Sequence, residues 1–404
     1  MTDRGARAGA DEPRRPAVTP RALVLGERGA VALTACRALG RAGYDVGVTN
    51  WRQSEAALSR HAFRSYRIPA IENGVDDWSG RVRAIVASEG YNVILATTDV
   101  AVAAFPYVQL SVPTCPQVSV RHLALIDKAL LADLCRVASV EYPRTDQPRT
   151  DDEDDAAARR VRGPMIVKAA RSALLLEDTV VHLPGAHVVG DPLSARAALR
   201  SIRRRGLQPI VQEYLEGDKL QAVILRRAET TSCRLAYRVV REYPLERGDE
   251  AMLEAVRATD GIGAEMVAML ERLADATGYE GLLQAEFLRN RENGRLRVID
   301  VNPRLWGSLR FAEMLGFRMT ERVMQDALGL STPPEPPDPG GRRYHHLVRE
   351  LRWVRAKGHV PAGYLASYAP RDVWDTPSLT DPLPELLRLK RIWNGRPARK
   401  TSDG

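Results

Sequence analysis

The stretch that decides the fold lies at residues 281–316 and reads GLLQAEFLRNRENGRLRVIDVNPRLWGSLRFAEMLG. Two apolar runs, at residues 282–288 and 296–301, flank a short polar turn that is rich in Asn and Gly. Strand-like runs on either side of such a turn are typical of a β-hairpin. The sequence therefore predicts a hairpin here.

The register of this hairpin would gather oxygen-bearing side chains. If the turn is centred on Asn293, Glu286 lies opposite Asp300, and in the same way Gln284 lies opposite Asn302. Side chains alternate between the two faces of a strand, and directly opposed β-carbons are roughly 4.5–5.5 Å apart. Two carboxylates and two amide oxygens in one small volume suit Mg²⁺, which is usually held by one or two carboxylates together with substrate phosphates. The alternative is that Glu286 and Asp300 are solvated acids, paired with some of the chain's many arginines.

The run that begins at Asp300, DVNPRLWGSL, resembles the metal-binding signature of the ATP-grasp superfamily. Its continuation, Pro-Arg-x-x-Gly-Ser, is similar to the branch that contains carbamoyl-phosphate-synthetase-type grasp domains and many amino acid ligases. The resemblance implies that Glu286, Asp300 and Asn302 bind two Mg²⁺ ions, or Mn²⁺ in their place. It also implies that Arg304 is catalytic and steadies an acyl phosphate or the transferred phosphoryl group. Asp300 departs from the more common Glu, which shortens the reach of this ligand by one methylene group.

Two of the six lysines occupy positions that fit a nucleotide site. Because arginine supplies most of the positive charge, a lysine indicates a place where a compact ammonium is needed. Lys128 is expected near the start of a helix, and Lys168 ends a short apolar strand; by the resemblance, both contact the phosphates of ATP. Taken alone, Lys128 would be unremarkable, since most lysines at the start of a helix are solvated. The loop after Lys168 lacks the family's glycines, so Arg171 and Ser172 are expected to supply side-chain donors instead.

Residues 209–225, PIVQEYLEGDKLQAVIL, predict two strands joined by a short connector and resemble the adenine hinge of ATP-grasp enzymes. The resemblance implies that the backbone at Glu213 and Leu215 pairs with the adenine edge. It further implies that Asp218 binds the ribose hydroxyls and that Gln212 belongs to the same nucleotide-binding set. The alternative is a plain hairpin connection that carries surface acids.

The next strand carries Arg238, at a position where the family often has a basic phosphate contact. Residues 242–252, EYPLERGDEAM, then resemble the substrate loop of this branch without its usual double glycine. A helix over residues 264–277 has an apolar stripe that is typical of a core-facing helix rather than of a site.

The N-terminal part predicts a separate α/β unit. Residues 1–20 are rich in Arg, Ala, Pro and Gly and predict a disordered tail. Residues 21–120 alternate strands with helices, the order of a parallel sheet, and resemble the Rossmann-like domain that precedes many ATP-grasp folds. The first turn, GERGA, matches a dinucleotide fingerprint weakly and is interpreted as structural. In TTDVAVAAF, Thr98 or Asp99 is expected to cap a helix.

The resemblance implies an ATP-grasp domain over residues 121–330, with a mobile lid at about 163–225. Within it, the acidic segment at residues 144–160 is interpreted as a solvated, mobile loop. Residues 331–404 are expected to form a Pro-rich linker and an extension that packs on the grasp fold or assists a homodimer. His345 and His346 in this extension are interpreted as packing or surface residues.

The composition of the chain argues against several classes of protein. The formal charge of +8 comes from arginines that are mixed with acids, without a nucleic-acid-binding motif, so nucleic-acid binding is not favoured. No run approaches the length of a membrane span, and there is no apolar signal-peptide core near the start. Four scattered cysteines form no CxxC pair, which favours a reduced, cytoplasmic protein.

The expected fold class is therefore α/β: a Rossmann-like parallel domain, an ATP-grasp fold with a lid, and a C-terminal extension. The expected activity is ATP-dependent ligation of a small carboxylate to a small amine, such as an amino acid, through an acyl phosphate with release of ADP and phosphate. Two alternatives stay open: a bicarbonate-activating carboxylase or carbamoyl-phosphate-type enzyme, and a non-catalytic nucleotide-binding protein.

Overall fold

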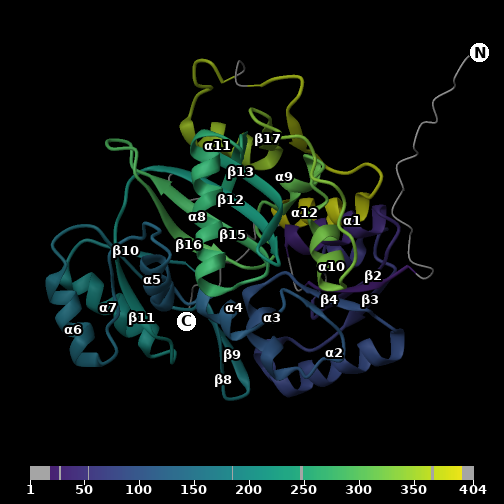
Figure 1. Cartoon of the computed structure of the whole chain (residues 1–404), viewed down its shortest axis with the longest axis horizontal. Helices are drawn as coiled ribbons and strands as arrows, with labels where there is room; N and C mark the ends of the chain where they lie inside the picture. The colour runs from purple at the N-terminus through teal and green to yellow at the C-terminus, as the bar shows by residue number, and fades with distance from the viewer. Residues whose placement is uncertain are drawn as a thin grey trace, which may run out of the picture.

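The computed structural model describes residues 19–393, apart from residues 27–28, 53, 184, 246–248 and 365–367. The predicted tail falls almost entirely outside the described residues, as does part of the GERGA turn. The described chain forms two large sheets, a smaller sheet and a separate two-stranded hairpin, with helices packed around them (Figure 1). No helix in the described part of the chain is both long and apolar enough to span a bilayer.

The N-terminal unit is a five-stranded parallel sheet in the order β3-β2-β1-β4-β5, as the alternating pattern predicted. Its strands are β1 (Arg21–Leu25), β2 (Asp45–Asn50), β3 (Arg64–Arg67), β4 (Val93–Ala96) and β5 (Thr114–Cys115). Its helices are α1 (Ala30–Arg41), α2 (Val75–Glu89) and α3 (Asp99–Ala104), with short 3₁₀ turns at Ala56–Leu58, Ile71–Asn73 and Phe105–Tyr107. Thr98, rather than Asp99, caps α3: its hydroxyl accepts a hydrogen bond from the Ala101 N–H at 3.2 Å.

Two helices, α4 (Val120–Ile126) and α5 (Lys128–Val137), lead to a four-stranded antiparallel sheet in the order β10-β7-β11-β6. The elements of this sheet are β6 (Thr145–Asp146), α6 (Asp151–Arg160), β7 (Met165–Ala169), β10 (His187–Val189), α7 (Pro192–Arg203) and β11 (Pro209–Glu213). Between β7 and β10, strands β8 (Ala173–Leu176) and β9 (Thr179–His182) form a hairpin. Ala173 and Val180 of that hairpin are buried in a core shared with the N-terminal unit.

The expectation of a mobile acidic loop at residues 144–160 was wrong, because this segment contains α6. Thr150 caps the helix, and the acidic residues lie in its first turn, where the helix dipole favours negative charge. Asp154 is buried and accepts a hydrogen bond from Arg203 Nη2 at 2.8 Å. The helix therefore contributes to a folded unit.

The largest sheet has seven strands in the order β16-β15-β12-β13-β14-β17-β18. They are β12 (Asp218–Arg227), β13 (Thr230–Tyr243), β14 (Asp249–Val256), β15 (Gly281–Arg289), β16 (Leu296–Asn302), β17 (Arg343–His346) and β18 (Val373–Asp375). Helix α8 (Gly261–Thr277) buries its apolar stripe against one face, as predicted. The other face shares a core with the N-terminal unit and with α9 (Leu309–Met314) and α10 (Met319–Ala327).

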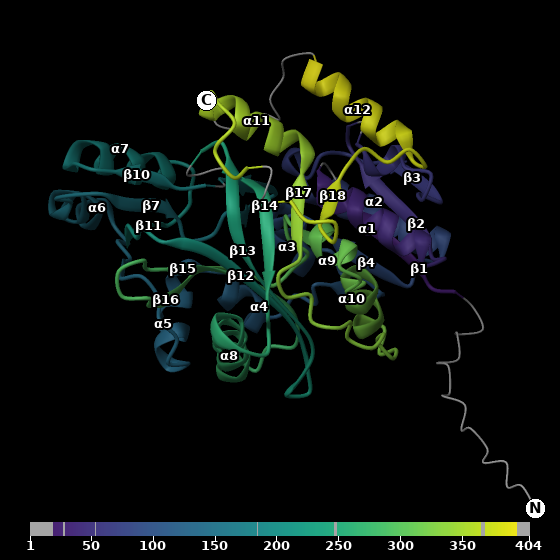
Figure 2. The ribbon, with the colours of Figure 1, turned by 90° about the horizontal axis from the view of Figure 1, so that it is seen from above.

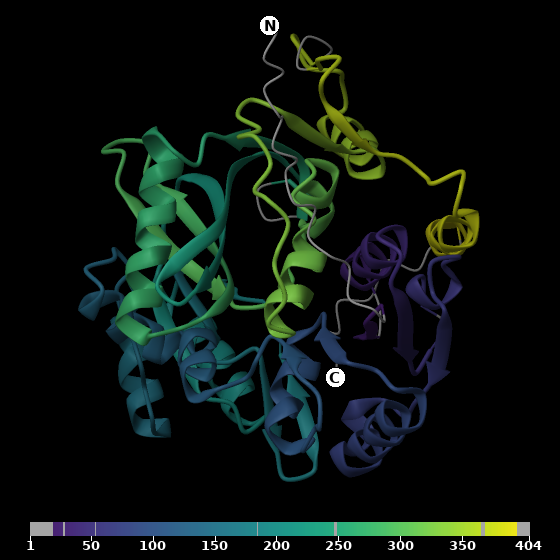
Figure 3. The same ribbon diagram turned by 45° about the vertical axis from the view of Figure 1, so that its right-hand side comes forward.

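The C-terminal extension packs on the seven-stranded sheet. Strands β17 and β18 extend the large sheet beyond β14, and α11 (Leu347–Lys357) follows β17 (Figure 2). His345 is fully buried and stacks on Trp374, in agreement with a packing role. The last helix, α12 (Pro382–Trp393), lies beside the N-terminal unit (Figure 3).

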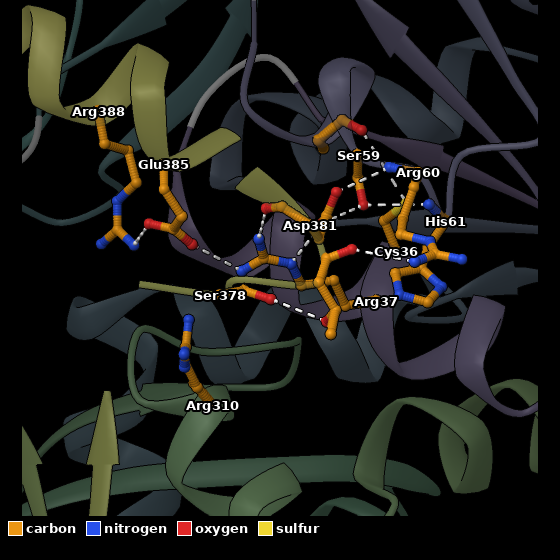
Figure 4. A network of polar contacts seen from close by, with 12 residues as sticks. Cys36, Arg37, Ser59, Arg60, His61, Arg310, Ser378, Asp381, Glu385 and Arg388 are labelled. Atoms are coloured by element: carbon orange, nitrogen blue, oxygen red, sulfur yellow. Dashed lines mark hydrogen bonds and ion pairs between the residues drawn. The ribbon is translucent and has the colours of Figure 1, made fainter. Parts of the chain in front are cut away.

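A buried ion network fastens this last segment. Arg37 of α1 donates to Asp381 Oδ2 at 2.8 Å and to Glu385 Oε1 at 3.0 Å (Figure 4). Asp381 also accepts from the Ser59 hydroxyl at 2.7 Å and from the Arg60 N–H at 2.9 Å. The two ends of the described chain are thereby joined.

Candidate active site

The hairpin β15–β16 has the predicted register. Glu286 pairs with Asp300, and Gln284 pairs with Asn302. A β-bulge beside this pair leaves Ile299 without a partner on β15, a feature that the sequence did not reveal. The two acids therefore lie side by side on one face of the sheet.

Both predicted lysines reach this hairpin from other elements. Lys128, the first residue of α5, lies 3.1 Å from Asp300 Oδ1 through its Nζ, while Asp127 caps the helix. Lys168, on β7 of the smaller sheet, donates from Nζ to the carbonyl oxygen of the bulged Ile299 at 3.4 Å. Burial lowers the pKa of Lys168 to about 8. Burial alone would also lower the pKa of Lys128, but Asp300 outweighs it and the pKa is raised.

Burial and neighbouring negative charges both disfavour ionisation of Glu286. Burial raises the pKa of Glu286 to about 7, and the negative charges of Asp300 and then Glu250 add to this effect. Among the described residues, no group of three or more His, Cys, Asp or Glu side chains is arranged to hold a metal by itself. Two carboxylates beside the Asn302 amide nevertheless fit Mg²⁺, which keeps most of its coordination for water and substrate phosphates. The donor set therefore fits a nucleotide-bound Mg²⁺.

The floor of the site is a ladder of hydrogen bonds that links three side-chain amides to Tyr237 and Glu250. Asn302 Nδ2 donates to Gln284 Oε1 at 2.8 Å, and Gln284 Nε2 donates to Gln221 Oε1 at 3.2 Å. Gln221 Oε1 also accepts from the Tyr237 hydroxyl at 2.8 Å, while Gln221 Nε2 donates to Glu250 Oε1 at 2.8 Å. Gln284 is almost fully buried, so these bonds fix the face that carries the acids.

Arg304 lies at the end of the hairpin and donates from Nη2 to Asn302 Oδ1 at 3.1 Å. Its Nε donates to Asp99, which also accepts from the Ser172 hydroxyl at 3.0 Å. Sequence reasoning missed Asp99, because it was considered only as a helix cap. The signal available was its place three residues beyond the end of the parallel strand β4, where such sheets commonly carry functional side chains.

The two predicted strands and their connector are present, in two different sheets, and the residues assigned to the adenine hinge differ in burial. β11 ends at Glu213, and the connector leads into β12 at Asp218. Gln212 is buried and donates to Thr145 Oγ1 at 2.9 Å, while Leu215 is half-buried in the connector. Asp218 is exposed and accepts from Arg291 at 2.8 Å.

The structure does not bring Arg238 to the acidic pair. Arg238 pairs with Leu220, which in turn pairs with Phe287. Both apolar residues are buried on the side of the sheet that α8 covers, so Arg238 lies on the opposite face from Glu286. There it forms an ion pair with Glu254 at 2.6 Å. Successive side chains of β13 point to opposite faces of the sheet, so a position one residue away would lie on the face of Glu286.

No protein-family model matches the sequence, and no curated protein is significantly similar to it. Solved structures do resemble it. The biotin carboxylase domain dimer of Hydrogenobacter thermophilus 2-oxoglutarate carboxylase, in complex with MgADP, ADP and bicarbonate, has a TM-score of 0.60 at 15% identity over 80% of this chain and 72% of that one. The Staphylococcus aureus N5-carboxyaminoimidazole synthetase complexed with ADP has a TM-score of 0.60 at 13% identity, covering 81% of this chain and 82% of that one. An L-amino acid ligase from Bacillus licheniformis has a TM-score of 0.57 at 15% identity, covering 77% and 74%. The chain therefore has the ATP-grasp fold.

Proposed function

We propose that the protein is an ATP- and Mg²⁺-dependent ligase that activates a small carboxylate as an acyl phosphate and transfers the acyl group to a small amine. One observation carries this proposal: Lys128 of α5 and Lys168 of β7 converge on the hairpin that carries Glu286 and Asp300. Paired acids beside two buried lysines fit the phosphates and metal of a nucleotide. The ATP-grasp fold and the nucleotide complexes of its structural neighbours support the same function.

The side chains have distinct roles in this proposal. Lys128 and Lys168 bind phosphate oxygens of ATP, and Arg304 binds the oxygens of the acyl phosphate, because its planar fork matches such groups. Gln212, Glu213 and Leu215 border the adenine, with Asp218 near the ribose. Ser172 orients the loop beside the phosphates. No covalent enzyme intermediate is needed, since the carboxylate itself attacks the γ-phosphorus and ADP leaves.

Glu286, Asp300 and Asn302 would hold Mg²⁺, which neutralises charge on the phosphate oxygens. Asp300 also forms an ion pair with Lys128 at 3.1 Å. In the proposed reaction each group instead binds the nucleotide, Asp300 through Mg²⁺ and Lys128 through a phosphate.

Turnover with trapping tests the proposal. ADP formation is measured with Mg-ATP and pooled carboxylic and amino acids, with hydroxylamine present to trap an acyl phosphate as a hydroxamate. The Asp300→Ala/Asn302→Ala double variant is compared with Glu292→Ala, which changes an exposed acid in the turn of the same hairpin.

ADP and hydroxamate from one pool, lost in the double variant and kept in Glu292→Ala, are the expected results. If only bicarbonate stimulates ADP formation, the proposed function is replaced by carboxylation. The bicarbonate complex of the Hydrogenobacter neighbour suggests that chemistry. Mg-ATP binding without turnover in any pool would favour a non-catalytic protein, and activity that survives the double substitution would refute the metal assignment.

A further inference from the structure

Asp99 reaches the candidate site from the N-terminal unit. It follows β4 and is the first residue of α3, yet Thr98 provides the helix cap, so the Asp99 carboxylate is not needed for that purpose. Its two oxygens are instead shared between two other segments. Oδ1 accepts from Arg304 Nε, and Oδ2 accepts from the Ser172 hydroxyl at 3.0 Å.

The contacts of Arg304 show what this arrangement leaves free. A guanidinium has five N–H donors. Within the described part of the chain, Asp99 takes the Nε donor, the Leu305 carbonyl takes one Nη1 donor at 3.0 Å, and Asn302 Oδ1 takes one Nη2 donor at 3.1 Å. Two donors, one on each terminal nitrogen, remain for an oxyanion. Held at three points, the guanidinium has little freedom to rotate.

Charge supports the same arrangement. Burial opposes ionisation of Asp99, but the positive charge of Arg304 outweighs it, and with help from Lys128 and Ser172 the pKa falls to about 2. Asp99 is therefore an anion throughout the neutral range. It balances the positive charge of Arg304.

The second oxygen of Asp99 restrains the glycine-poor loop after Lys168. Ser172 is bound by Asp99, and the preceding Arg171 donates from Nε to Asp127 Oδ2 at 2.8 Å. The hairpin that follows is docked on the N-terminal unit, where Asp178 Oδ1 accepts from the Val75 N–H at 2.9 Å. The side chains of Ser172, Arg171 and Asp178 therefore hold this segment in place.

We propose that Asp99 is a positioning residue for the ligase reaction: one oxygen orients Arg304 toward the acyl phosphate, and the other holds the loop beside the nucleotide phosphates. This proposal rests on the function proposed above and assigns the N-terminal unit a direct part in organising the reaction. Misplacing a group that binds reacting oxygens by about 1 Å can cost about 100-fold in rate. Asp99→Asn, which keeps the shape but loses the charge, is expected to lower kcat by about 10- to 100-fold.

A double-mutant cycle tests the role. Asp99→Asn, Arg304→Lys and their combination are compared by kcat, by KM for the carboxylate and by Mg-ATP affinity. If Asp99 orients Arg304, the double variant is no slower than Arg304→Lys alone, and because Asp99 also holds the loop beside the nucleotide phosphates, Asp99→Asn weakens Mg-ATP binding equally in both backgrounds. Asp178→Asn is the matched control: it weakens another link between the docked hairpin and the N-terminal unit, and it should leave kcat unchanged. Fully additive losses in kcat, or an equal loss in Asp178→Asn, would overturn the proposal.

A second cycle separates this proposal from the proposed function. The urea unfolding midpoints of the unmodified protein, Asp99→Asn, Arg304→Lys and the double variant test whether the two side chains interact. We expect the effects of the two substitutions on stability to be coupled, because the side chains touch. Coupling without any turnover by the unmodified protein would refute the ligase function and, with it, the positioning role of Asp99 in that reaction, while leaving the contact established. Turnover together with uncoupled midpoints and additive kcat losses would refute the positioning role alone.

Discussion

Replacing Arg37 by Met should break the network that fastens α12 to the N-terminal unit. The Arg37 side chain is only 6% exposed, and its carboxylate partners Asp381 and Glu385 are 2% and 8% exposed (Figure 4). Arg37 also donates from Nη2 to the Asp381 carbonyl at 3.1 Å. The substitution keeps an apolar stem of similar length but leaves two buried carboxylates without their shared cation.

The structure sets the size of this effect. Removing one partner of a buried ion pair typically costs about 3–5 kcal/mol, because the remaining charge stays buried. Asp381 would keep its bonds from Ser59 and Arg60, and Glu385 would keep Arg388 at 3.2 Å. These remaining donors favour the lower end of the range, so a loss of about 3 kcal/mol is expected.

Urea unfolding measures the global loss, and amide hydrogen exchange in α12 measures local release, since a terminal element can open without the rest of the fold. Arg64→Met is the control, because Arg64 forms an exposed pair with Glu89 and surface pairs contribute little. The reasoning would be refuted if Arg37→Met lowered stability by less than about 1 kcal/mol and left the exchange of α12 amides unchanged.

Three further substitutions probe the site and its supports. His122 is buried without a hydrogen-bond partner among the described residues, and burial, followed by the charge of Arg304, lowers its pKa to about 4. The unfolded chain protonates His122 at a higher pH than the folded chain does, so the stability of the protein falls as pH drops from about 6.5 to 4. Urea unfolding should therefore show His122→Leu to be more favourable for stability at pH 5 than at pH 7.5, by about 2 kcal/mol. Lys168→Met should weaken Mg-ATP binding by about 10- to 100-fold in calorimetry without lowering stability, because a buried charge is removed. Gly217→Ala would place a Cβ 2.4 Å from the Arg289 carbonyl oxygen, so it should destabilise the hinge by about 1–3 kcal/mol in thermal unfolding and weaken nucleotide binding.

The core of the site was predictable because its geometry is local. A short turn and a two-residue period determine which side chains of β15 and β16 face each other, and the structure has Glu286 opposite Asp300 as expected. The bulge at Ile299 was not predictable. The carbonyl oxygen of Ile299 accepts a hydrogen bond from Lys168, which lies in a different sheet. The parallel N-terminal sheet was also readable from its regular alternation of strands and helices.

Two errors had signals that the sequence did contain. In the segment interpreted as a mobile acidic loop, Thr150 is followed three residues later by Glu153, the pattern of a capping box. The structure confirms the cap: Thr150 Oγ1 accepts from the Glu153 N–H at 3.2 Å. For Arg238, counting the strand period through β13 in register with β12 would have placed it on the face of Leu220, away from the acids.

The remaining features depend on contacts between distant parts of the chain, which no local pattern encodes. Strand β17 has only four residues, Arg343–His346, and it becomes a strand because β14 offers a free edge. Likewise, the partner of Arg304 lies 205 residues away in another unit, so the Asp99 contact could be found only in the folded molecule.

Two buried cations of the site each have a carboxylate partner within the chain. Lys128 is paired with Asp300, and Arg304 is paired with Asp99, so neither charge is buried alone. The two pairs differ in what substrate binding would do to them. Under the proposed function, Lys128 and Asp300 separate to bind phosphate and Mg²⁺, whereas Arg304 keeps Asp99 and uses its two remaining donors. One pair therefore acts as a substitute for the nucleotide, and the other is a permanent part of the catalytic arrangement.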